Sequence, residues 1–122
     1  MYQILVLGEK FQEDMEKTLL KQGFSTAYAA TEEEVLNQIK TSPPDVILID
    51  YSTDPAGQLE IQKKIKTSYE DFIKFVAILP EKREPFEEID RAKKISNESM
   101  RKPLKGRDLA SLLMNVVYKV SE

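Results

Sequence analysis

The run Val46-Ile47-Leu48-Ile49 is the feature that most constrains the fold of this chain. Four consecutive apolar residues, three of them β-branched, suit the centre of a parallel sheet, where both faces of a strand are covered. Asp50 follows the run directly, at the start of a polar loop that extends to Gly57. Ligand sites of open α/β folds lie at the carboxyl ends of their strands, so the sequence predicts that Asp50 belongs to such a site.

Segments with strand and helix patterns alternate along the chain, which is typical of a parallel sheet with crossover helices. Apolar residues spaced by three or four indicate the helices, and short apolar runs indicate the strands. The predicted strands are 3–7, 24–29, 46–49 and 73–79, and the predicted helices are about 11–22, from Thr31 to the prolines at 43–44, 58–66, from Pro85, and a last one that follows Gly106.

Local signals mark the ends of these helices. Gly23 ends the first helix, and Thr31 with Glu34 has the spacing of a capping box at the start of the second. Ser42-Pro43-Pro44 ends the second helix, because proline cannot continue it. In the third helix, Gln62 interrupts the apolar face.

Composition excludes several classes of site. The chain has no cysteine, which excludes disulfides and thiolate metal sites, and no histidine, which excludes Ser-His and Cys-His catalysis within it. Its 21 acidic and 18 basic residues are distributed along the whole length, without the clustered basic face of a nucleic-acid binder. With 122 residues and 41% apolar content, we expect one domain, 1–122.

The chain also has no apolar run long enough to span a membrane. Residues 1–3 lead straight into the first predicted strand without a cationic leader. We therefore expect a cytoplasmic protein that binds neither membrane nor nucleic acid.

Two further segments place polar residues at strand ends. Gly8-Glu9 follows the first predicted strand, and Lys102-Pro103 follows another short stretch that could be extended. Together with the segment from Pro44 to Asp50 and with Leu59-Glu60-Ile61, they resemble the receiver domain of two-component response regulators. The resemblance extends from Ile4 to Val117.

The resemblance implies a doubly wound, flavodoxin-like α/β fold with five parallel strands in the order 2-1-3-4-5. It assigns the fifth strand to 96–101, a segment that propensity alone would leave as a loop. It also implies that Asp50 accepts a phosphoryl group from a histidine kinase or phosphotransfer protein, and that Lys102 pairs with the phosphoryl oxygens. Glu9, Asp50 and the backbone carbonyl of Ser52 would hold Mg²⁺.

The sequence departs from the family pattern at three positions. Gly8 stands where the family has the first of two acids, which predicts weak Mg²⁺ binding. Leu79-Pro80 stands where a Thr or Ser hydroxyl would bond the phosphoryl group, and neither residue has a side-chain donor. Ser99 occupies the position of the aromatic switch residue. Asp54 could supplement the metal site, although an Asp before a proline is more often a turn former.

These observations leave three functional hypotheses. The first is a signalling receiver, not an enzyme, with Asp50 as phospho-acceptor. The second is a pseudo-receiver that binds partners without phosphorylation. In either case the fourth helix, fifth strand and last helix would bind an effector or a second copy. The third, a flavodoxin-like enzyme or nucleotide binder, is disfavoured because no glycine-rich loop follows the first strand and the chain has only four glycines.

Overall fold

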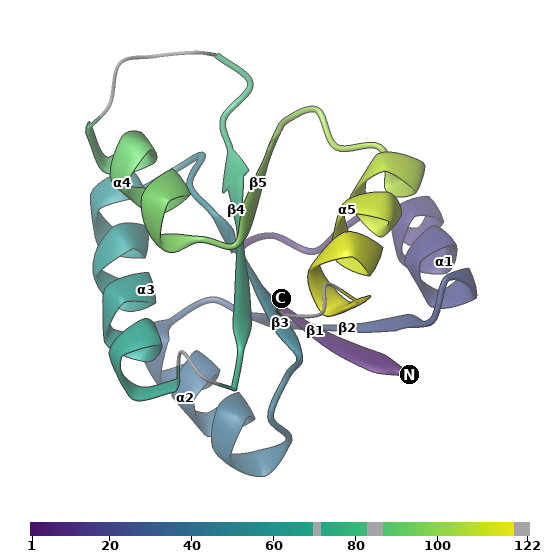
Figure 1. Cartoon of the computed structure of the whole chain (residues 1–122), viewed down its shortest axis with the longest axis horizontal. Coiled ribbons are helices and arrows are strands. Elements are labelled where there is room, and N and C mark those ends of the chain that lie inside the picture. Colours follow the sequence, from purple (N-terminus) through teal and green to yellow (C-terminus); the bar gives the residue numbers. More distant parts are fainter. Residues whose placement is uncertain (70–71, 83–86, 119–122) are drawn as a thin grey trace.

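The computed structural model describes residues 1–69, 72–82 and 87–118. These residues form one parallel sheet with the strand order β2-β1-β3-β4-β5, as predicted, and helices alternate with the strands (Figure 1). The elements are β1 (Tyr2–Leu7), α1 (Glu13–Lys21), β2 (Phe24–Ala29), α2 (Glu32–Thr41), β3 (Val46–Asp50), α3 (Pro55–Tyr69), β4 (Lys74–Leu79), α4 (Glu87–Ile95), β5 (Glu98–Arg101) and α5 (Gly106–Tyr118).

Helices cover both faces of the sheet. Figure 1 shows α2, α3 and α4 on one side and α1 and α5 on the other. Successive residues of β3 alternate between the two cores: Ile47 and Ile49 pack with α2, α3 and α4, whereas Val46 and Leu48 pack with α1 and α5. The central apolar run is therefore buried on both faces, which is why it contains no polar position.

The polar segment before Lys102 is a strand, as the resemblance implied. β5 pairs in parallel with β4, from Val76 opposite Glu98 to Leu79 opposite Arg101. It lies at the edge of the sheet, and none of its residues is fully buried. An edge strand of this kind needs little apolar surface, so its composition resembles that of a loop.

The third helix is longer than predicted. It spans Pro55–Tyr69 instead of 58–66, because Asp54 caps it: the Asp54 carboxylate accepts a hydrogen bond from the Gly57 backbone N–H at 3.2 Å. Asp54 is thus a capping residue, and part of the predicted polar loop is helical. The first helix is shorter than predicted and begins at Glu13, after an N-cap residue whose side chain forms no capping bond.

The predicted capping box of α2 is present with one difference. The Thr31 hydroxyl accepts from the Glu34 N–H at 3.2 Å, but the Glu34 carboxylate accepts from the N–H of Ala30 at 2.7 Å, one residue before the cap. The predicted start of the fourth helix at Pro85 lies outside the described residues, within which α4 begins at Glu87. Over the described part of the chain, no helix has the length and apolar content needed to cross a membrane.

Candidate functional site

Asp50 and Lys102 lie side by side at the carboxyl edge of the sheet. Asp50 ends β3, Lys102 directly follows β5, and the Lys102 ammonium lies 2.7 Å from Asp50 Oδ2. Their side chains are 17% and 33% exposed, so the pair is partly shielded but open to solvent. The Lys102 N–H also donates to the carbonyl of Leu79 at 3.0 Å, which continues the β4–β5 pairing to the lysine itself.

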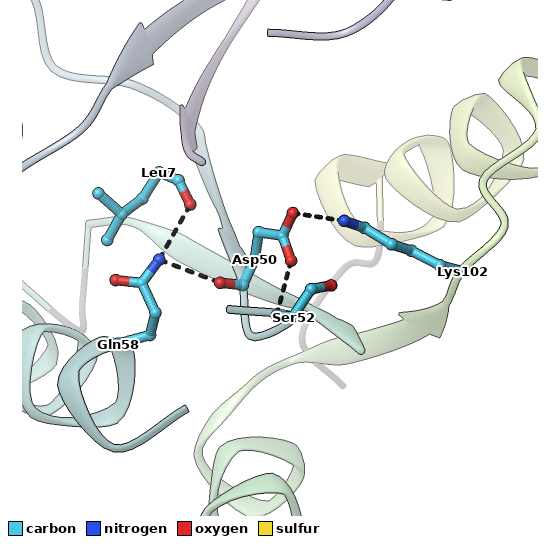
Figure 2. A network of polar contacts seen from close by, with 5 residues as sticks. All are labelled: Leu7, Asp50, Ser52, Gln58 and Lys102. Atoms are coloured by element: carbon cyan, nitrogen blue, oxygen red, sulfur yellow. Dashed lines mark hydrogen bonds and ion pairs between the residues drawn. The ribbon is translucent and has the colours of Figure 1, made fainter. Parts of the chain in front are cut away.

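Both oxygens of the Asp50 carboxylate have a partner (Figure 2). Oδ2 contacts Lys102, and Oδ1 accepts a hydrogen bond from the backbone N–H of Ser52 at 2.8 Å. The carboxylate is therefore oriented from two sides by groups that come from different parts of the chain.

Gln58 and Gly8 complete the surroundings of Asp50, and sequence reasoning assigned no role to Gln58. The Gln58 side-chain amide donates to the backbone carbonyl of Asp50 at 3.0 Å and to that of Leu7 at 3.4 Å (Figure 2). Gly8 faces Asp50 so closely that a Cβ atom at residue 8 would lie 2.8 Å from Asp50 Cβ. The sequence would have pointed to Gln58 only if the start of α3 at Pro55 had been recognised, because this early start places the Gln58 side chain in the first turns of the helix.

Glu9 lies in the same pocket as Asp50 and Lys102. This pocket of about 370 Å³ is lined by both polar and apolar residues, Glu9, Lys10, Phe11, Gln12, Met15, Asp50, Ile78, Lys102, Pro103 and Leu104. The loop that carries Glu9 is held by Tyr28 of β2, whose hydroxyl oxygen accepts from the Phe11 N–H at 3.2 Å. The topology thus brings the three predicted side chains to one pocket.

The donors around this pocket fit a hard cation such as Mg²⁺. Glu9 and Asp50, which line this pocket, carry carboxylate oxygens of the kind that Mg²⁺ prefers, and Mg²⁺ usually keeps several waters besides. Ser52, whose backbone carbonyl was predicted as a further ligand, is not among the residues that line this pocket and lines a different one. No cluster of three or more His, Cys, Asp or Glu side chains that could hold a metal occurs among the described residues. The Ser52 hydroxyl is buried and has no hydrogen-bond partner within the same residues.

The positions of the family's switch residues have other contacts here. Leu79 is buried in the core, and the backbone carbonyl of Pro80 accepts a hydrogen bond from the Arg101 guanidinium at 2.7 Å. Ser99 lies on β5, where its side chain is half-buried. The contact between Pro80 and Arg101 joins the end of β4 to β5 through a backbone acceptor.

A buried chain of hydrogen bonds begins next to Asp50. The Tyr51 hydroxyl donates to Gln62 Oε1, Gln62 Nε2 donates to the Ser96 hydroxyl at 2.8 Å, and that hydroxyl donates to the carbonyl of Ala92 at 2.6 Å. Tyr51 and Gln62 are both 0% exposed. Burial raises the pKa of Tyr51, which keeps its hydroxyl protonated as a donor. Tyr51 begins the loop after β3, as predicted, but its side chain is buried and does not belong to a polar surface. Gln62 interrupts the apolar face of α3, as predicted, and it is buried because it forms a hydrogen bond with Tyr51 inside the core.

The strand order and the alternating helices are those of the fold of response-regulator receiver domains. Solved structures with this fold cover nearly the whole chain. The receiver domain of the TMAO respiratory-system response regulator TorR covers 99% of this chain and 100% of its own, at 13% identity and a TM-score of 0.82. The chemotaxis protein CheY4 of Vibrio cholerae covers 95% of this chain and 98% of its own, at 21% identity and a TM-score of 0.75.

A longer protein also contains this fold. NtrX from Brucella abortus, in complex with ATP, covers 97% of this chain at 18% identity and a TM-score of 0.79, but the chain spans only 27% of the NtrX chain. Neither a protein-family model nor a curated protein matches the sequence. At these identities, the comparisons establish the fold alone.

Proposed function

We propose that this chain is a cytoplasmic receiver module of two-component signalling and that Asp50 is its phospho-acceptor. The contact of 2.7 Å between the Lys102 ammonium and Asp50 Oδ2, at the carboxyl edge of the sheet, is the observation that carries the proposal. Phosphoryl transfer to a carboxylate needs an accessible oxygen nucleophile and a fixed positive charge beside it, and this pair supplies both. The receiver fold of the chain supports the same conclusion.

In the proposed reaction, one Asp50 carboxylate oxygen attacks the phosphorus of a phosphohistidine on a histidine kinase or phosphotransfer protein. An O–P bond forms, the P–N bond of the donor breaks, and the donor imidazole leaves with the electron pair. Lys102 neutralises charge on the phosphoryl oxygens, and the Ser52 N–H holds Asp50 in position. Glu9, Asp50 and the Ser52 carbonyl would hold Mg²⁺, which supplies further charge neutralisation when bound. Because Gly8 contributes no carboxylate, Mg²⁺ binding would be weak.

A second candidate function is that of a pseudo-receiver, a module that binds its partner without phosphorylation. It is favoured by the absence of a side-chain donor at Leu79 and Pro80, and by the engagement of the Pro80 carbonyl with Arg101. A ligand shifts a two-state equilibrium only through contacts that differ between the states, and the contact that would distinguish them has no donor here. The surface made by α4, β5 and α5 would then bind an effector or a second copy in a preformed state.

Exposure to a small-molecule phosphodonor with excess Mg²⁺ separates the two candidates. We expect slow addition of one phosphoryl group, measured by intact mass, and complete loss of this labelling in the Asp50→Asn protein. Asp54→Asn is the matched control, because it removes a neighbouring carboxylate that caps α3, and it should still be labelled. Labelling that persists in Asp50→Asn would refute Asp50 as the acceptor. A complete lack of labelling at saturating donor and Mg²⁺ would favour the pseudo-receiver.

We further expect that occupation of Asp50 leaves the α4-β5-α5 surface nearly unchanged. Addition of Mg²⁺ and beryllofluoride should shift backbone NMR signals around Asp50 and Lys102, while the signals of described residues in α4 and β5 move little. Partner binding by the Asp50→Asn protein should equal that of the native protein within about twofold, a difference below roughly 0.5 kcal/mol. Large shifts across 80–102 that vanish in Asp50→Asn would show an ordinary phosphorylation switch instead.

A further inference from the structure

One side-chain amide joins the ends of the two strands that carry the proposed site. The parallel pairing of β1 with β3 ends at Leu7 opposite Ile49. Just there, Gln58 of α3 donates from the same nitrogen to the carbonyl of Leu7 at 3.4 Å and to that of Asp50 at 3.0 Å (Figure 2). The amide thus extends the connection between the strands beyond their last paired residues.

The close approach of these strand ends leaves no room for a side chain at residue 8. A Cβ atom on Gly8 would lie 2.8 Å from Asp50 Cβ, well inside the 3.5 to 4.0 Å at which two carbon atoms attract each other most. Gly8 is not among the glycines with positive φ, a set that contains only Gly23 in the described residues. Glycine is therefore required at residue 8 by space and not by backbone conformation.

We infer that Gln58 is a positioning residue that holds the ends of β1 and β3 at the spacing that only glycine at residue 8 permits. A larger residue 8 could be accommodated in two ways. Asp50 could move, but the Ser52 N–H and the Lys102 ammonium hold its carboxylate. The strand ends could separate instead, which would break at least one of the two Gln58 hydrogen bonds.

The inference deepens the proposed function and rests on it in one respect. Glu9 follows Gly8, so the spacing set by Gln58 also sets the room between the Glu9 and Asp50 segments in which Mg²⁺ would bind. The absence of an acid at residue 8 then accompanies a narrow spacing between the ends of β1 and β3. Placing an aspartate at residue 8 would therefore not by itself restore metal binding.

A double-mutant cycle between Gly8→Ala and Gln58→Met tests the coupling, because methionine keeps the length of the side chain but has no donor. Measured by equilibrium urea unfolding, Gly8→Ala should lower the folding equilibrium constant by roughly tenfold in the native background, as overpacking does. In the Gln58→Met background, the factor by which Gly8→Ala lowers the folding equilibrium constant should be smaller by at least about threefold. Equal losses in both backgrounds would overturn the inference.

The matched control cycle combines Gly8→Ala with Gln38→Met. Gln38 is a half-buried glutamine of α2 whose side chain forms no hydrogen bond within the described part of the chain. In this cycle the effects of the two substitutions on the folding equilibrium constant should multiply, since residues that share no contact act independently. Coupling as large as that seen with Gln58 would mean that Gly8→Ala disturbs the whole fold, and would overturn the specific role of Gln58.

A second measurement tests the positioning role directly. The Ser52 amide signal, which reports on the Asp50 carboxylate, is followed by NMR during Mg²⁺ titration of Gly8→Asp with and without Gln58→Met. The double variant should bind Mg²⁺ roughly tenfold more tightly than Gly8→Asp alone, an effect within the range of coupled neighbours. Equal affinities would overturn the inference. If no variant binds Mg²⁺, or Gly8→Asp does not fold, the alanine cycle still decides the role of Gln58, and the absence of binding counts against Mg²⁺ in the proposed function.

Discussion

Replacement of Gln62 by leucine is expected to lower the free energy of unfolding by about 2–3 kcal/mol. Most of this is the cost of leaving the buried Tyr51 hydroxyl without an acceptor, and a smaller part comes from the lost hydrogen bond to Ser96. Leucine removes the acceptor of the Tyr51 hydroxyl and the donor to Ser96. Tyr51 is fully buried and cannot turn to water, whereas Ser96 is half-buried and keeps its bond to the Ala92 carbonyl. Most of the loss therefore arises at Tyr51, and equilibrium chemical unfolding measures it.

The tyrosine provides the means to check this explanation. In the Tyr51→Phe, Gln62→Leu double variant both members of the buried bond are apolar, and such replacements can be nearly neutral. The double variant should therefore recover most of the stability that Gln62→Leu loses. Gln38→Leu on α2, with no side-chain hydrogen bond among the described residues, should change stability by less than about 0.5 kcal/mol. If Tyr51→Phe deepens the loss instead, the hydrogen bond is not its source.

Replacement of Lys102 by methionine is expected to slow phosphoryl labelling of Asp50 by roughly 100-fold, the effect typical of removing one group that stabilises charge in a transition state. The methionine side chain keeps most of the length of lysine but has no charge to place beside Asp50 Oδ2. The rate is measured by intact mass over time with an excess of phosphodonor and Mg²⁺. Because native labelling is itself expected to be slow, the comparison needs long time courses.

Lys105→Met is the matched control for this experiment. Lys105 lies three positions further along the same connection, is exposed, and has no ion pair among the described residues. It should be labelled at the native rate within about twofold, as expected for a surface substitution away from the site. Equal slowing in both variants would indicate a general effect of positive charge on the donor. No slowing in Lys102→Met would remove the lysine from the proposed mechanism.

Much of the fold follows from patterns that lie within short segments. A run such as Val46-Ile47-Leu48-Ile49 indicates a strand buried on both faces, and helices were found from spacing and from the capping signals around Thr31. The polar β5 is the exception, because an edge strand buries little and has no distinctive composition. It was placed only through the resemblance, and the pairing with β4 agrees with that placement.

The sequence by itself determined the alternation of strands and helices and the positions of Asp50 and Glu9 at strand ends, whereas Lys102 was placed at a strand end only through the resemblance. Parallel strands joined by helical crossovers all point their carboxyl ends to one edge, so residues at those ends meet although they are far apart in the chain. The Asp50 and Lys102 side chains, separated by 52 positions, meet for this reason.

Only the tertiary structure decided which other side chains surround this pair. The bonds from Gln58 to Leu7 and from Gln62 to Ser96 join residues 51 and 34 positions apart. They depend on where α3 begins and which way it is rotated against the sheet, and no local pattern carries that information. The contact of Gly8 with Asp50 likewise depends on the spacing of two strand ends. A polar residue within an apolar helix face looks the same in the sequence whether it is solvated or satisfied by a distant partner, because hydrogen bonding inside a core depends on geometry that folding alone creates.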